Sequence, residues 1–180
     1  IVHNVVARKI EFIPNYFKGV ATSKPTQIRL DIKFKDYQKM TYYRKVALSN
    51  YTIPPFIKEE EFSAELISDG QVIPVKLKLM GFNLDHIGDY DKWSFRVKAK
   101  KNNTFFGMKK FSLLVPQSRG YLSEWIYHML KKREGLISLR YDFVDVTING
   151  KHRGLYVIEE HFDKRLIENN NLREGVLFKP

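Results

Sequence analysis

The chain has 180 residues, of which 43% are hydrophobic and 14% aromatic. It is too apolar for a disordered chain, and its apolar runs are far shorter than the ~20 residues of a transmembrane helix. The composition therefore predicts a soluble globular unit around one core, and the absence of cysteine excludes disulfide and thiolate chemistry.

The charge is strongly basic, with 31 Lys and Arg against 20 Asp and Glu and a formal net charge of +11. More than half of this excess lies between Gln71 and Lys110. Such a balance favours polyanionic partners, namely nucleotides, nucleic acid or an anionic surface.

Residues 1–61 are expected to form an amino-terminal extension that contains one strand and one helix. The role of this extension is unknown. Residues 28–34 alternate apolar and polar side chains, as a half-buried strand does, and residues 36–48 contain few helix breakers. The stretch from 49 to 61 resembles a linker, with two prolines and three glutamates. We place a domain boundary there and expect a second unit over residues 62–180.

The second unit is expected to begin with four strands. Residues 62–67 and 72–79 alternate and flank Asp69-Gly70, a typical turn of a two-residue hairpin. Residues 93–99 have one apolar and one basic face, and residues 108–115 form the next strand after a turn.

A helix is predicted from about Tyr121 to Glu134, ended by Gly135. At 100° per residue, one arc of this helix is apolar and is expected to pack on the sheet; its members are Leu122, Trp125, Ile126, Met129 and Leu130. Glu124 lies opposite the arc and is expected to face solvent.

Two strands, 142–148 and 155–158, follow the helix and are joined by Asn149-Gly150, another hairpin signal. The predicted fold class is therefore α+β, with an antiparallel sheet of about five strands, one main packed helix and the amino-terminal extension.

Several motifs in this order carry a resemblance to a known family. They are 92–97 (KWSFRV), 107–111 (GMKKF), 136–144, Asn149-Gly150 and 154–160 (GLYVIEE). Together they resemble the CotH spore-coat kinase family, over roughly residues 72–179. The resemblance implies the layout of a protein-kinase amino-terminal lobe in an atypical Ser/Thr kinase that binds ATP with Mg²⁺.

The resemblance also implies which parts of a kinase site are absent. The family's metal-binding and catalytic acids belong to a carboxy-terminal lobe, which is expected beyond Pro180. The chain starts at Ile1 and stops in an apolar run, so we expect a piece of a longer protein that is inactive by itself. Phosphoryl transfer needs metal ligands for charge neutralisation, and this chain is not expected to hold them.

Seven residues are candidates for nucleotide binding: Gly81, Lys92, Arg96, Lys109, Lys110, Glu159 and Glu160. Gly81 opens a loop whose backbone N–H groups could cover phosphates, although its three aspartates would repel them. The cations suit charge-assisted contacts to triphosphate, whereas the other basic residues on these strands are interpreted as a solvated face. Alternation places Lys109 and Lys110 on opposite sides of their strand and does not choose between them.

Glu159 and Glu160 follow the last strand, where a kinase hinge would meet the adenine. They could also replace the missing helix glutamate as partners of a strand cation, or simply open the next helix, where the helix dipole favours acids.

Two other functions are compatible with the sequence. One is a non-catalytic module that binds a ligand or surface, as in a pseudokinase or an invasin-like member of the family. Nucleic-acid binding is disfavoured, because the basic strands have no obvious platform for base stacking. The protein substrate stays open, as does the location between bacterial cell envelope and cytoplasm.

Overall fold

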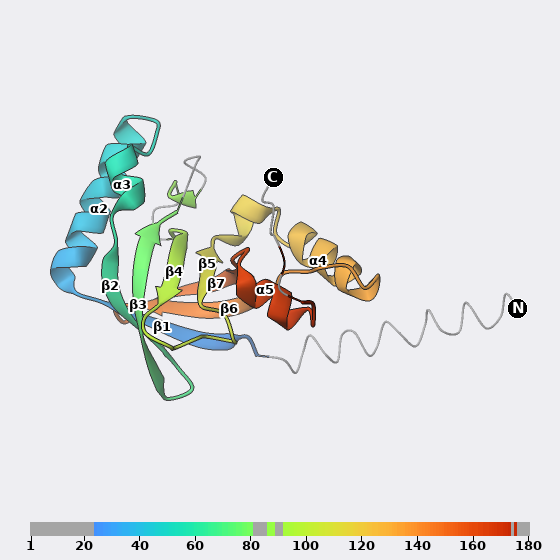
Figure 1. The fold of residues 1–180 in the computed structure, drawn as a ribbon. Helices are drawn as coiled ribbons and strands as arrows, with labels where there is room; N and C mark the ends of the chain where they lie inside the picture. Colours follow the sequence, from blue (N-terminus) through green and yellow to red (C-terminus); the bar gives the residue numbers. More distant parts are fainter. Residues whose placement is uncertain (1–23, 81–85, 89–91, 174, 176–180) are drawn as a thin grey trace, which may run out of the picture.

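A computed structural model describes residues 24–80, 86–88, 92–173 and 175, and Figure 1 shows their arrangement. Seven strands form the body of the molecule: β1 (Thr26–Ile32), β2 (Phe62–Ser68), β3 (Gln71–Leu79), β4 (Phe95–Ala99), β5 (Lys110–Leu114), β6 (Tyr141–Ile148) and β7 (Lys151–Glu160). They form a closed barrel in the order β1-β2-β3-β4-β5-β7-β6.

The predicted fold class, an antiparallel sheet with an appended extension, is wrong. β1 pairs antiparallel with β2 and parallel with β6, in the register Thr26↔Val144 to Leu30↔Ile148, and so closes the sheet into a mixed barrel. Closure provides hydrogen-bond partners for the backbone N–H and C=O groups at both edges of the sheet, which would otherwise be unpaired. The strand predicted at 28–34 exists, but it is an integral part of the barrel.

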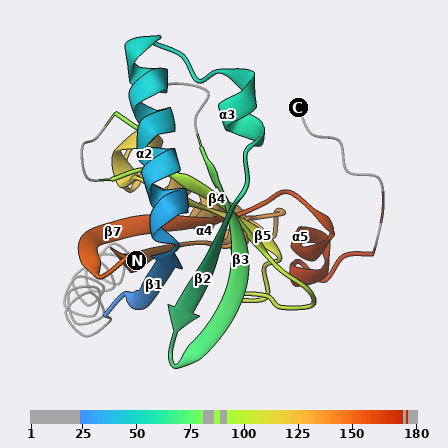
Figure 2. The same ribbon diagram turned by 90° about the vertical axis from the view of Figure 1, so that its left-hand side faces the viewer.

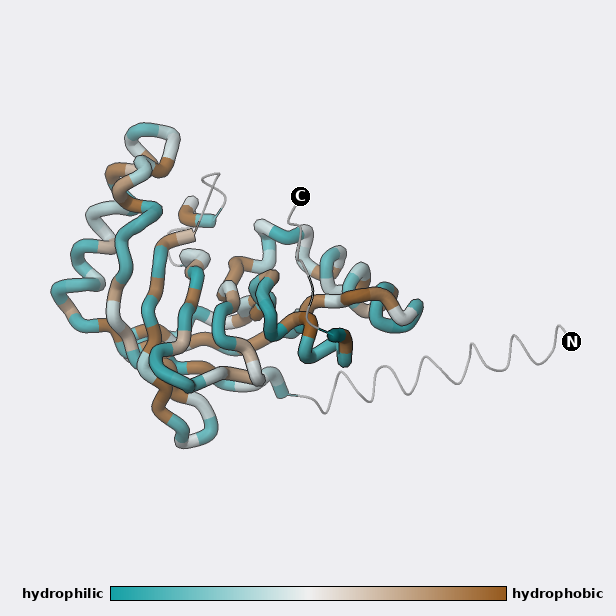
Figure 3. Tube along the Cα trace, in the orientation of Figure 1, coloured by the Kyte–Doolittle hydropathy of each residue, from teal (hydrophilic) through white to brown (hydrophobic). Residues whose placement is uncertain are grey.

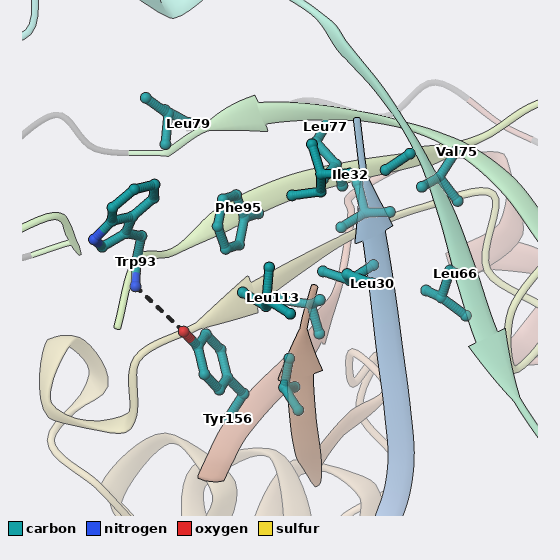
Figure 4. Packing of buried hydrophobic residues seen from close by; sticks show 14 of the residues in the cluster. Leu30, Ile32, Leu66, Val75, Leu77, Leu79, Trp93, Phe95, Leu113 and Tyr156 are labelled. Carbon is teal, nitrogen blue, oxygen red and sulfur yellow. Dashed lines mark hydrogen bonds between the residues drawn. The ribbon is translucent and has the colours of Figure 1, made fainter. Parts of the chain in front are cut away.

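The barrel interior is filled by alternate side chains of every strand. Figure 4 shows part of this core, including Leu30, Leu77, Phe95 and Leu113, all completely buried. At one end, the backbone N–H of Trp93 donates to the buried Tyr156 hydroxyl at 3.2 Å, so that this polar atom is satisfied inside the core.

Two helices between β1 and β2 cover one end of the barrel, as Figure 2 shows: α2 (Phe34–Ser49) and α3 (Pro55–Glu59). The helix predicted over 36–48 is thereby confirmed. Met40 is buried against the core, Tyr37 stacks on Trp93, and the Arg44 guanidinium donates from Nε to the carbonyl of Ile87 at 2.7 Å.

The helix predicted over 121–134 is confirmed as α4 (Ser123–Arg133), which follows the short 3-10 helix η2 (Pro116–Arg119). Of the predicted buried face, Trp125 packs on the outside of the sheet, whereas the prediction is wrong for the other members. Ile126, Met129 and Leu130 are 44%, 49% and 50% exposed, whereas His128 is only 8% exposed. Glu124, which was expected to face solvent, pairs instead with Arg119 of η2, and His128 stacks on Tyr141, so the side of the helix with these two residues faces the barrel.

The last helix is α5 (Lys164–Asn169), whose N-cap Asp163 accepts a hydrogen bond from the Arg165 N–H at 2.9 Å. None of the helices in the described ranges is both long and apolar enough to cross a membrane.

Candidate functional site

The outer surface of β3, β4 and β5 carries cations in two rows that run across the strands. In one row Lys78 lies beside Arg96, Arg96 beside Ser112, and Ser112 beside Glu159 of β7. In the next row three lysines are direct neighbours: Lys76, Lys98 and Lys110. Like charges directly opposite each other destabilise a sheet, so this second row favours an anionic partner.

These rows form two adjoining hollows of about 510 and 250 Å³. Lys78 and Arg96 line both, so we describe them together as the cationic groove. The larger hollow is lined by Lys58, Glu59, Lys78, Leu79, Met80, His86, Arg96 and Arg119, and the smaller one by Glu61, Lys76, Lys78, Arg96, Val97, Lys98, Lys110 and His161.

The cations of the groove differ in how far they are neutralised. Lys78 Nζ lies 3.0 Å from Glu59 Oε2 and 4.0 Å from Glu61 Oε1. Arg96, Lys98 and Lys110, in contrast, form no direct ion pair with any carboxylate of the described residues, although the Arg96 charge acts on Glu159 and opposes the rise in its pKa that burial causes. Their charge is thus available to an anionic ligand.

One border of the groove is a cluster of charged groups beneath α4. Arg119 Nη1 lies 3.3 Å from Glu124 Oε1, and Arg119 Nη2 lies 3.2 Å from Glu159 Oε2. Burial raises the pKa of Glu159, the Arg119 and Arg96 charges oppose that shift, and the Glu124 charge adds to it. Burial likewise raises the pKa of the Tyr141 hydroxyl, with the two carboxylates as further causes. Arg119 therefore joins α4 to β7 at the edge of the groove.

Three of the predicted site residues share this surface. Arg96 and Lys110 line the groove, and Glu159 holds Arg119 at its border. Lys110 thus lies on the same face as Arg96, whereas Lys109 precedes β5, accepts from the Ala99 N–H through its carbonyl, and lines neither hollow.

The other predicted residues lie elsewhere. Lys92 Nζ is 3.5 Å from the Leu155 carbonyl oxygen and 6.0 Å from the centre of the Tyr156 ring. Glu160 is 2% exposed and pairs with the Arg140 guanidinium, while its second oxygen accepts from the Arg140 N–H at 3.0 Å. Glu160 is therefore a structural residue. Gly81 lies outside the described residues.

Sequence reasoning missed Lys78 and Arg119. Lys78 was interpreted as part of a solvated face, yet its outward position on β3 is next to Arg96, and a correct hairpin register would have placed it there. Arg119 has no local signal, because its position depends on the contact of η2 with Glu124 and Glu159.

The groove fits a phosphate-bearing ligand. The three cations without a direct ion pair suit phosphate oxygens, and Met80 supplies an apolar contact. The groove does not fit a divalent metal by itself: the described part of the chain contains no cluster of three or more His, Cys, Asp or Glu side chains suited to metal binding.

Comparison with protein families gives one match. The family model described as CotH kinase protein matches residues 84–180, slightly more than half of the chain. The match begins before β4 and includes Arg96, Lys98, Lys110 and Arg119, whereas Lys78 precedes it. The resemblance predicted from the sequence motifs is thus confirmed. A search of curated proteins found no match.

Proposed function

Because the chain belongs to the CotH kinase family, we propose that it contributes the nucleotide-binding surface of an ATP-dependent protein kinase. The observation that carries this proposal is the set of three cations without a direct ion pair, Arg96, Lys98 and Lys110, on one face of the barrel. Phosphoryl transfer relies mainly on positioning and charge neutralisation, which such a surface provides.

The groove residues would contribute different contacts to a bound nucleotide. Arg96 presents a planar fork that can donate two hydrogen bonds to one phosphate, whereas Lys98 and Lys110 act as compact point charges. Met80 offers an apolar contact to the less polar part of a nucleotide. Magnesium, when bound with ATP, supplies further neutralisation of the phosphate charge, and none of the groove residues is assigned to hold it.

The test is a titration of the chain with ATP, followed through the fluorescence of its two tryptophans or by calorimetry. Arg96→Gln should weaken binding about ten- to a hundredfold, because a hydrogen bond to a charged group contributes roughly 1.5–3 kcal/mol. Arg29→Gln is the matched control: Arg29 is an exposed cation on β1, paired with Asp31. Wild-type affinity in Arg96→Gln, with an unchanged melting temperature, would show the groove assignment to be wrong.

A second candidate is a non-catalytic module that binds an anionic surface. The neighbouring lysines Lys76, Lys98 and Lys110 support it, because a flat row of like charges also suits a polyanion. The two functions differ in ligand: for the kinase, inorganic triphosphate should compete for the ATP site at a defined stoichiometry. For the surface module, heparin should bind in a strongly salt-dependent way, and the binding of ATP should not reach saturation.

A further inference from the structure

The outer side of α4 is unusually apolar for a surface helix. Leu122, Ile126, Met129 and Leu130 project away from the barrel and are about half exposed. Leu136 and Ile137, in the segment after the helix, are exposed as well, and this segment is brown in Figure 3. Grouped apolar side chains on a surface mark a site of interaction, because a partner that covers them removes apolar area from water.

A hollow of about 590 Å³ lies directly beside this apolar side. α4 contributes Trp125, His128, Met129 and Lys132 to it, and the opposite wall comes from 138–142 and the end of α5. Met129 thus belongs both to the exposed side of α4 and to the hollow. A large side chain from a partner could enter the hollow while its neighbours cover the helix.

The charge around this surface is positive. Lys131, Lys132 and Arg133 occupy the last turn of α4, and Lys132 lines the hollow. None of the three forms an ion pair with a carboxylate of the described residues. Cations favour a helix C-terminus, which accounts for their position along α4, but their charge is still available to an acidic partner.

We propose that the exposed side of α4 and the adjoining hollow form a docking surface for an acidic amphipathic helix of a partner protein. The partner's apolar residues at helical spacing would cover Ile126 and Leu130, one of them would enter the hollow, and its carboxylates would face Lys132 and Arg133.

Charge and shape favour this partner over two others. A second copy of the chain would bring the same cationic turn and the same net charge of +11 to the contact. A lipid surface would bring acyl chains against the charged lining of the hollow, which includes Lys132 and Asp142, whereas a protein side chain can pair with these charges.

The experiment uses the whole chain and a fluorescent 18-residue peptide with leucines at helical spacing and glutamates elsewhere, read out by anisotropy. We expect saturable binding, weakened about tenfold or more by Ile126→Asp and by Arg133→Glu. Val72→Asp is the matched control, because Val72 is a half-exposed apolar residue on β3. It should bind as wild type does. Because Ile126 is half exposed, its variant should keep the wild-type melting temperature.

Each of the following results would overturn the proposal. They are an absence of binding, equal binding of a peptide with lysine in place of glutamate, unchanged affinity in Ile126→Asp, and dimers in sedimentation that Ile126→Asp dissociates. The last measurement uses vesicles containing phosphatidylserine. If the wild type binds these vesicles more tightly than it binds the peptide, and Ile126→Asp does not bind them, α4 is a lipid-binding element instead.

Discussion

Arg119 is the residue at which the groove and α4 meet. Its guanidinium lies between Glu124 of α4 and Glu159 of β7 and also borders the larger hollow. An anionic ligand in the groove would compete with these carboxylates for the same cation. The protonation state of Glu159 should therefore affect both the stability of the fold and the charge at the border of the groove.

Glu159→Gln should change how stability depends on pH. Because the folded state raises the pKa of Glu159, it binds this proton more tightly than the unfolded chain does. The resulting stabilisation is present in acid and is lost as the pH rises through the folded-state pKa. Relative to Glu159→Gln, the wild type should thus lose stability in urea unfolding as the pH rises above 4.5, the ordinary pKa of a glutamate. The exposed Glu65→Gln is the control and should follow the wild-type curve.

Glu160→Gln should destabilise the protein by about 3 kcal/mol, the lower end of the range for breaking a buried ion pair, because Arg140 keeps some contact with water. Glu59→Gln also removes an ion pair, with Lys78, but the Glu59 side chain is 82% exposed and should contribute less than about 1 kcal/mol. Chemical denaturation of both variants checks this. Equal losses would contradict the structural role of Glu160.

At the scale of the element, α4 shows how a helix can lie with its apolar side outward. Trp125 packs against the small cluster of Leu114, Tyr141 and Val157 on the outside of the sheet, while His128 stacks on the Tyr141 ring at 5.3 Å. The helix is thus held by an aromatic contact and by the Arg119–Glu124 pair, not by its leucines.

Substitutions in α4 should reflect this orientation. Trp125→Ala should cost about 2–3 kcal/mol, below the ~3–5 kcal/mol of a fully buried tryptophan, because the ring is only partly buried. Leu130→Ala, at a half-exposed position, should cost less than about 1 kcal/mol. Thermal melts of the two variants measure the difference, and a larger loss for Leu130→Ala would mean that α4 lies the other way round.

At the scale of the whole molecule, β1 determines whether the sheet is open or closed. It hydrogen-bonds to β2 on one side and to β6 on the other, and its Ile28, Leu30 and Ile32 point into the core. The boundary predicted near residue 61 therefore separates β1, α2 and α3 from the strands that they cover. That residues 62–180 form a separate unit is still a prediction.

Removal of residues 1–61 tests it. The remaining chain, 62–180, lacks β1 and leaves the free edges of β2 and β6 exposed to solvent, so we expect aggregation or non-cooperative unfolding. A chain of residues 24–180 retains every described strand and serves as the control. Size-exclusion chromatography and circular dichroism distinguish the outcomes; a monomeric, cooperatively folded 62–180 would support the separate unit instead.

The sequence by itself determined the local structure and the family. Alternation and the Asp69-Gly70 and Asn149-Gly150 turns identified most of the strands, and two helices were located within a few residues. Alternation on β4 also placed Arg96 on a basic outer face, and the motifs from Lys92 onward indicated the CotH family that the family model confirms. These features are local, since a few neighbouring residues decide them.

Only the tertiary structure decided what each face contacts. The parallel pairing of β1 with β6 joins residues more than a hundred positions apart and has no turn signal, so barrel closure could not be predicted. The rotation of α4, the burial of Glu160 and the place of Arg119 at the groove depend on distant partners in the same way. Periodicity shows which side chains share a face of a helix or strand. Whether that face is buried depends on the groups that pack against it, and only the folded chain brings those groups together.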